Sequence, residues 1–179
     1  MVEIRGLKLL YSEECLKKRI RQLGAQISED YRDQELLCVC VLKGAIFFFT
    51  DLVRTIENQK LMVDFLKASS YGSGISTSYE VKIVKDLNLD IKGRHVLLVE
   101  DVIDSGITMQ KVIPMLRARE AADVRLCALI DKRERREVDI PIDYTGFVLN
   151  KGFIVGYGLD LAEKYRQLPA IYEAVIEEN

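Results

Sequence analysis

Residues Val96–Thr108 read VLLVEDVIDSGIT and carry the strongest fold signal in the chain. The apolar run Val96–Val99 is typical of a strand that is buried on both faces in a parallel sheet. Two adjacent carboxylates, Glu100 and Asp101, come directly after it, and Asp104 follows three residues later. The small residues after Asp104 predict a tight loop that leads into a helix.

This loop has the features of a phosphate-binding turn. Ser105, Gly106 and Thr108 carry hydroxyl groups or no side chain, and such a loop directs backbone N–H groups and a helix N-terminus towards one spot. The neighbouring carboxylates would repel a phosphate alone, so the pattern fits a sugar phosphate bound together with a metal ion. Neither GxxxxGK[ST] nor GxGxxG occurs here, which excludes a P-loop and a Rossmann fingerprint. A plain acidic loop is the alternative, and three carboxylates beside this turn disfavour it.

The bulk composition is that of a globular protein with a substantial core. The chain has 179 residues, enough for one domain, of which 49% are hydrophobic and 30% charged. Its formal charge of −2 gives no drive towards nucleic acid. No apolar run approaches the roughly 20 residues that span a bilayer, and the N-terminal stretch MVEIRGLKLLYSEE lacks a secretory pattern. We therefore expect no membrane or nucleic-acid partner.

The cysteines indicate a reducing compartment. Cys15, Cys38, Cys40 and Cys127 form no CxxC pair, and we expect all four to be small buried hydrophobes in a cytoplasmic protein. A structural zinc site is disfavoured because His95 is the only histidine. We assign His95 no catalytic role.

Strands and helices alternate along the chain, which predicts an α/β fold with a mostly parallel central sheet flanked by helices. Ser12 caps a helix that apolar periodicity carries to about Asp33. In such a sheet ligands bind beyond the carboxyl ends of the strands, where residues 100–108, Lys43 and Lys132 fall. The other expected elements are strands over residues 35–42, 61–68, 81–84, 96–99, 124–130, 145–149 and 153–155, helices over 45–57 and 108–119, a polar loop over 69–79, and a helical turn or two over 161–168.

Residues 96–108 resemble the phosphoribosyl pyrophosphate motif of the type I phosphoribosyltransferases, which is a hydrophobic strand, two acidic residues and a short loop of small and hydroxyl residues. Further segments are similar to the purine branch of that family, from about Leu36 to Arg166. They are LKG at residues 42–44, SSYGSG at 69–74, DK at 131–132 and FIVGYGLD at 153–160. The resemblance implies the type I phosphoribosyltransferase fold as a single domain over residues 1–179, with a small hood subdomain formed by the N-terminal and C-terminal segments.

The implied reaction is purine salvage. It moves the 5-phosphoribosyl group from phosphoribosyl pyrophosphate to a 6-oxopurine, hypoxanthine or guanine, and gives IMP or GMP and pyrophosphate. One alternative is a relative that prefers xanthine, and another is a regulator that binds the donor without turnover, against which intact Asp104 and Lys132 argue. We also expect a homodimer or homotetramer.

The resemblance assigns the sugar and metal contacts. Glu100 and Asp101 would hold the ribose hydroxyls directly or through Mg²⁺, which prefers carboxylate, substrate and water oxygens. Asp160 would be a further metal-linked carboxylate, and Asp104 the general base near the purine N7. Ile107 stands where some relatives carry lysine, so one cationic phosphate contact is missing. The implied cradle of the 5′-phosphate consists of Asp104, Ser105, Gly106, Ile107 and Thr108.

It assigns the pyrophosphate and purine contacts as well. The implied pyrophosphate site, with a cis peptide bond before Lys43 and residues 69–79 as a lid, consists of Lys43, Gly44, Ser70, Tyr71 and Arg166. The implied purine site consists of Lys132, Phe153, Ile154 and Asp160. Lys132 would donate to the 6-oxygen, which disfavours adenine because adenine presents a second donor there. Phe153 would stack on the base. Apart from Lys132, the basic cluster KRERR reads as solvated charge, with Arg133, Arg135 and Arg136 exposed.

Overall fold

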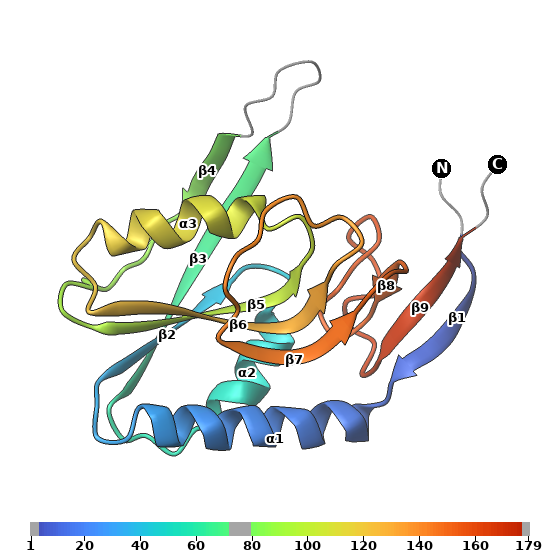
Figure 1. Cartoon of the computed structure of the whole chain (residues 1–179). Coiled ribbons are helices and arrows are strands. Elements are labelled where there is room, and N and C mark those ends of the chain that lie inside the picture. The colour runs from blue at the N-terminus through green and yellow to red at the C-terminus, as the bar shows by residue number, and fades with distance from the viewer. Residues whose placement is uncertain (1–3, 72–79, 177–179) are drawn as a thin grey trace.

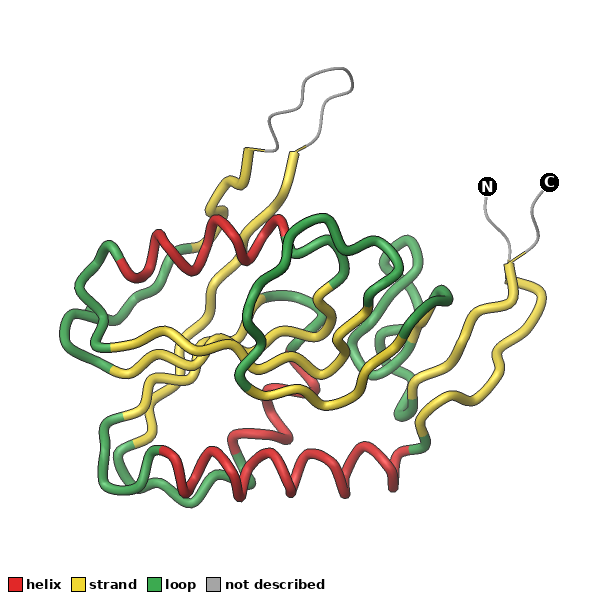
Figure 2. The backbone as a smooth tube through the Cα atoms, in the orientation of Figure 1, coloured by secondary structure: helices red, strands yellow, loops and turns green. Residues whose placement is uncertain are grey.

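A six-stranded sheet forms the centre of the computed structural model, which describes residues 4–71 and 80–176. The strand order is β4-β3-β2-β5-β6-β7, and all neighbours are parallel except β3 and β4. Figures 1 and 2 show the helices on both sides of this sheet. The α/β prediction is therefore confirmed. The strands are β2 (Leu36–Val41), β3 (Leu61–Tyr71), β4 (Glu80–Lys85), β5 (His95–Ile103), β6 (Asp123–Lys132) and β7 (Tyr144–Leu149).

The apolar run at the start of β5 is buried on both faces, as predicted. Leu97 and Val99 join the core beneath α1 (Glu13–Asp30) and α2 (Ile46–Val53). Val96 and Leu98 join the core beneath α3 (Ile107–Arg117) on the other side. Because alternate residues of a strand point to opposite faces, one unbroken apolar run supplies both cores.

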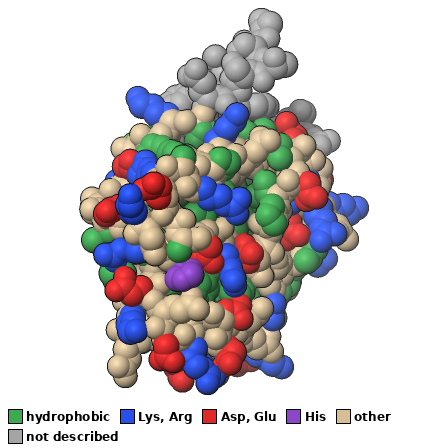
Figure 3. All heavy atoms as spheres, turned by 60° about the vertical axis from the view of Figure 1, so that its left-hand side comes forward, with side chains coloured by type: hydrophobic (Ala, Val, Ile, Leu, Met, Phe, Trp, Pro, Cys, Tyr) green, Lys and Arg blue, Asp and Glu red, His purple; other side chains and the backbone are tan. Residues whose placement is uncertain are grey.

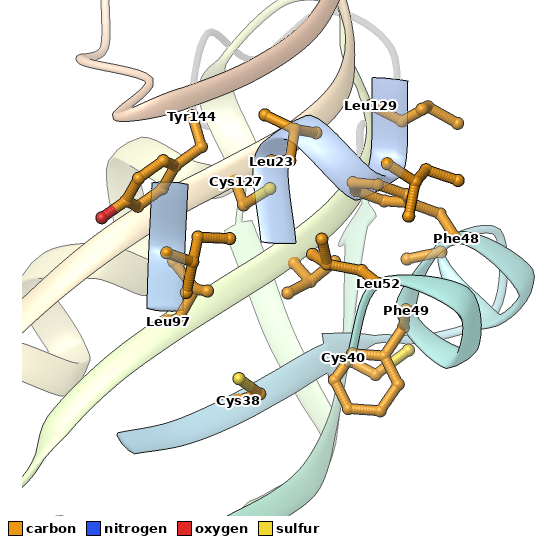
Figure 4. Close-up of a cluster of buried hydrophobic side chains, with 14 of the residues drawn as sticks. Leu23, Cys38, Cys40, Phe48, Phe49, Leu52, Leu97, Cys127, Leu129 and Tyr144 are labelled. Atoms are coloured by element: carbon orange, nitrogen blue, oxygen red, sulfur yellow. The ribbon is translucent and has the colours of Figure 1, made fainter. Parts of the chain in front are cut away.

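Helix α1 begins where the sequence predicts. The Ser12 side chain accepts a hydrogen bond from the Cys15 backbone N–H at 3.2 Å, and two glutamates occupy the first turn. Its buried residues recur at helical spacing as Leu16, Ile20, Leu23 and Ile27. Figure 4 shows Leu23 in the core with side chains of α2 and the sheet.

Three cysteines behave as expected and one does not. Cys38, Cys40 and Cys127 are buried in the core below α1 and α2 (Figure 4). Cys15 is exposed, because it lies on the side of α1 opposite the buried stripe. All four are free thiols.

A second, three-stranded sheet lies beside the first. Its order is β1 (Ile4–Tyr11), β9 (Ile171–Ile176) and β8 (Ile154–Val155). Strands β1 and β9 are antiparallel neighbours, so Ile4 lies opposite Ile176 (Figure 1). The sequence pattern did not predict β1 or β9. These are the segments from which we expect a hood, and the division into domain and hood stays a prediction.

Several boundaries differ from the expected ones. Strand β5 continues to Ile103, α2 ends at Val53, and β3 runs to Tyr71 into the expected polar loop. The remainder of that loop, residues 72–79, lies outside the described residues. Within the described ranges, no helix is long and apolar enough to cross a membrane.

The expected helical turn over residues 161–168 is wrong. This segment consists of turns closed by a bridge between Leu161 and Lys164, whose backbone N–H groups donate to each other's carbonyl oxygens at 3.2 and 3.0 Å. Ala162, Glu163 and Tyr165 have φ angles of 50°, 66° and 74°. A right-handed helix cannot contain such residues, and apolar spacing does not reveal them.

Candidate functional site

The predicted phosphate loop connects β5 to α3. Glu100 and Asp101 lie near the C-terminal end of β5, and Asp104 and Ser105 form the turn that follows it. Gly106 caps α3 with a φ of 86°, a left-handed conformation that glycine adopts without strain. The Ile107 N–H donates to Ser105 Oγ at 3.3 Å. The backbone therefore enters the helix as the sequence predicts, with the first N–H groups of α3 beside the acidic residues.

Three chain segments approach each other more closely than side chains would permit. A β-carbon on Gly44 would lie 1.7 Å from Asp101 Oδ2, and one on Gly158 would lie 1.9 Å from the Gly44 carbonyl oxygen. The end of β2, the end of β5 and the loop after β8 therefore meet at one place. The peptide bond between Leu42 and Lys43, just after β2, is cis, as expected.

Burial perturbs the acidic pair. Glu100 Oε2 is buried and has no hydrogen-bond partner among the described residues. Burial, and then the charge of Asp101, raises the pKa of Glu100 well above its usual value. Burial raises the pKa of Asp101 to about 6, although its own Oδ1 accepts a bond from the Val102 N–H at 2.8 Å. Two desolvated carboxylates side by side favour a bound cation.

The donor set fits Mg²⁺ held in part by substrate. No group of three or more His, Cys, Asp or Glu side chains suited to a metal occurs in residues 4–71 and 80–176. Mg²⁺ commonly uses one or two carboxylates and takes its other oxygens from water and phosphates. Asp160 is near enough for its charge to act on Asp101, but it pairs with Arg166, its Oδ1 lying 2.8 Å from Arg166 Nη2.

Lys132 and Asp104 are brought together. Lys132 ends β6 and is only 6% exposed, although lysine is rarely buried. Its Nζ lies 3.7 Å from Asp104 Oδ2 and 3.5 Å from Glu134 Oε2. The other carboxylate oxygen of Asp104, Oδ1, is buried without a partner in the described part of the chain. The predicted base and the predicted purine donor thus lie within ion-pair distance of each other.

Arg136 contacts the predicted loop in a way that the sequence pattern does not reveal. Its Nε donates to the Asp104 carbonyl oxygen at 2.9 Å, and its Nη2 donates to the carbonyl oxygens of Ile103 at 2.9 Å and Lys132 at 3.1 Å. Nη2 also pairs with Asp131 Oδ1 at 2.5 Å. The expectation of a solvated side chain is wrong for Arg136, whose side chain is only 17% exposed. The apolar residues after the cluster, Val138 and Ile140, were the only signal that the chain returns to the core here.

The remaining predicted residues lie around the same edge. Arg166 Nη1 donates to the Gly158 carbonyl oxygen at 2.8 Å, and its Nε is buried without a described partner. Ile154 is buried and Phe153 partly exposed, with the Phe153 carbonyl oxygen accepting from the Ala174 N–H at 2.8 Å. Ser70 and Tyr71 end β3, where their backbones pair with β4. The roles assigned to all these residues stay predictions.

His95 lies at the opposite edge, at the start of β5. Its Nδ1 lies 2.9 Å from Asp123 Oδ1, and Figure 3 shows the histidine on a face of mixed acidic and basic side chains. Because the site residues follow the ends of the strands, this histidine is remote from them along β5.

Loss of the Arg136 guanidinium should loosen the loop between β5 and α3. Hydrogen bonds to a charged group contribute about 1.5–3 kcal/mol, so Arg136→Ala should speed amide hydrogen exchange around residues 103–107 by about 10- to 100-fold. Arg135→Ala removes the same charge from an exposed neighbour and should leave this exchange unchanged. Equal rates in the two variants would show that Arg136 does not hold the loop.

Neutralising Glu100 should stabilise the ligand-free protein at high pH. In the wild type this group does not lower the free energy of unfolding below pH 4.5, the unfolded-state pKa, because it is protonated in both states. Above that pH the unfolded state ionises first, so the free energy of unfolding falls until the pH passes the raised folded-state pKa. Glu100→Gln should therefore unfold roughly 2–4 °C higher at about pH 8, the shift that about 1 kcal/mol produces at this size. The gap should close towards about pH 4. A calorimetric scan of Glu29→Gln, on the exposed side of α1, controls for loss of one charge. A gap that widens on acidification contradicts the assignment.

Comparison with known proteins identifies the family of the chain. Residues 8–162 match the phosphoribosyl transferase domain family. The chain is 46% identical over 172 residues to the hypoxanthine phosphoribosyltransferase of Salmonella typhimurium, covering 95% of this chain and 96% of that protein. A hypoxanthine-guanine phosphoribosyltransferase of Bacillus anthracis has a similar crystal structure, with a TM-score of 0.88 and 40% identity over 98% of this chain and 100% of that one. A solved hypoxanthine-guanine-xanthine phosphoribosyltransferase has a TM-score of 0.84 and 40% identity, over 96% and 97%. The chain therefore belongs to the phosphoribosyltransferase family, in its group of hypoxanthine phosphoribosyltransferases.

Proposed function

We propose that this enzyme transfers the 5-phosphoribosyl group from phosphoribosyl pyrophosphate to hypoxanthine or guanine, giving IMP or GMP and pyrophosphate. The observation that carries this proposal is the convergence of an acidic pair, a hydroxyl-rich turn and the ion pair of buried Lys132 with half-buried Asp104 at one edge of the sheet. The acidic pair would bind the sugar, the turn would bind the phosphate, and Lys132 with Asp104 would bind the purine. The names of the relatives agree with this assignment.

The donor would bind across the ends of β5 and α3. Glu100 and Asp101 would take the ribose hydroxyls, directly or through Mg²⁺, with Asp160 as a further carboxylate. The backbone N–H groups from Ser105 to Thr108, and the two hydroxyls there, would hold the 5′-phosphate. Ile107 supplies no cation, so this phosphate depends on neutral donors. When bound, Mg²⁺ would offset negative charge on the donor and on the acidic pair.

The purine would bind beside Lys132. The ammonium group would donate to the 6-oxygen of hypoxanthine or guanine, Phe153 would stack on the ring, and the Ile154 backbone would meet the base edge. Asp104 would hold N7 and accept its proton as the bond from C1′ to the purine nitrogen forms and the bond from C1′ to pyrophosphate breaks. The leaving pyrophosphate would be held by Lys43, Gly44, Ser70, Tyr71 and Arg166.

Asp104→Asn tests the base assignment. An amide cannot accept the proton, so kcat should fall by about 10²- to 10⁴-fold, the usual contribution of general acid–base catalysis. Donor binding should persist because the backbone of the loop is unchanged. Steady-state kinetics should show no such loss in Asp139→Asn, which changes an exposed aspartate. An unaltered kcat would remove Asp104 from this role.

Lys132→Ala tests purine recognition and separates the candidate functions. Nucleotide formation should be measured with hypoxanthine, guanine, xanthine and adenine, in the presence of donor and Mg²⁺. The variant should lose about 10- to 100-fold in kcat/KM for the 6-oxopurines, as removal of a charged hydrogen bond predicts, with little change in the KM for donor. Lys111→Ala on the exposed face of α3 is the control.

The outcomes differ between the alternatives. A wild type that prefers xanthine would favour the relative of that specificity, as the name of one solved structure suggests. Binding of donor without any product would identify a regulator instead of an enzyme. Equal loss of donor and purine binding in Lys132→Ala would show that Lys132 does not recognise the base.

We further propose a cytoplasmic homodimer or homotetramer. The free cysteines agree with a reducing compartment. Ile46 and Phe47 on α2 are 41% and 43% exposed, which supports a subunit contact on this helix. A monomeric mass by light scattering would contradict the assembly.

A further inference from the structure

Glu163 contacts both cations that the proposed function assigns to pyrophosphate. Its Oε2 lies 2.6 Å from Lys43 Nζ and 3.3 Å from Arg166 Nη2. Lys43 follows β2, whereas Glu163 and Arg166 lie in the turns after β8, so the carboxylate joins two segments that are distant in sequence. One oxygen atom thus bridges the two positive charges in the ligand-free protein.

The backbone directs this side chain. The Glu163 N–H donates to Asp160 Oδ2 at 2.8 Å, and Glu163 and Ala162 both adopt left-handed φ angles of 66° and 50°. Non-glycine residues occupy this region at a cost and only where the surroundings hold them. The turn therefore presents the carboxylate to Lys43 and Arg166 in one defined position.

The carboxylate is charged and easily displaced. Glu163, a glutamate that pairs with two cations, is ionised at neutral pH. Its side chain is 65% exposed, and that of Lys43 is 52% exposed. Exposed ion pairs are weak because water and salt screen them, so a more highly charged anion can replace this one.

We propose that Glu163 is a built-in competitor for the pyrophosphate site and sets its affinity for anions. This inference rests on the proposed function. If pyrophosphate takes both cations, the Glu163 ion pairs are lost. If the carboxylate stays, it repels the incoming phosphates. In both cases the negative charge at position 163 weakens binding of pyrophosphate and of the donor, and leaves the purine site unaffected.

Glu163→Gln provides the test. The amide keeps the shape and the ability to accept a hydrogen bond, but it lacks the charge. Titration calorimetry with pyrophosphate and Mg²⁺ should give a Kd about three- to fivefold lower than in the wild type, within the range of exposed ion pairs. The gain should shrink in high salt, and the KM for hypoxanthine should not change. Glu29→Gln, which removes an exposed glutamate that pairs with Arg32 on another face, should leave the Kd unaltered.

Several results would contradict the competitor role of Glu163. A Kd that is unchanged or higher in Glu163→Gln overturns the competitor role, the latter showing that Glu163 instead positions the cations. Glu163→Ala must change the Kd in the same direction, because the effect is one of charge. In a Lys43→Met background the gain should fall to less than half, and an undiminished gain would also count against the proposal. A wild type that binds neither pyrophosphate nor donor refutes the proposed function itself.

Discussion

The close approach of Gly44 to Asp101 is the constraint on which the rest of the site depends. A β-carbon at position 44 would lie 1.7 Å from the Asp101 carboxylate, and one at position 158 would lie 1.9 Å from the Gly44 carbonyl oxygen. Two missing side chains thus allow the end of β2, the end of β5 and the loop after β8 to meet. Without this contact, Lys43, the acidic pair and Arg166 would lie farther apart at this edge of the sheet.

The carboxylates at this meeting point are also desolvated. Burial raises the pKa of Asp101 to about 6, while Arg166 acts in the opposite direction and Asp160 adds to the increase. Glu100 Oε2, Asp104 Oδ1 and Arg166 Nε are buried without partners in the described part of the chain. Buried polar groups without partners are costly. These three atoms lie at one edge of the sheet, where a bound ligand would complete their hydrogen bonds, whereas the fourth such atom in the described residues, Tyr31 Oη, belongs to a ring beside His95.

The sequence predicts those parts of the molecule that local patterns determine. The apolar run of β5 and the turn after it were predicted because an uninterrupted apolar strand and a small-residue loop have distinctive compositions. Strands β1 and β9 were not, because each depends on a partner about 165 residues away. The sequence pattern predicts helix where turns follow Asp160, because left-handed φ angles at Ala162 and Glu163 leave no trace in the composition.

Arg136 shows that a residue outside the recognised sequence motifs can hold a site together. A basic cluster in a sequence is most often solvated, and nothing in KRERR distinguishes its last arginine from the others. In the fold, this guanidinium contacts the carbonyl oxygens of Ile103, Asp104 and Lys132. It therefore ties the loop that would hold the phosphate to the strand end that would read the purine. Because both substrates must be aligned for the sugar to move between them, Arg136 would help to position the transfer although it is not among the residues proposed to bind either substrate.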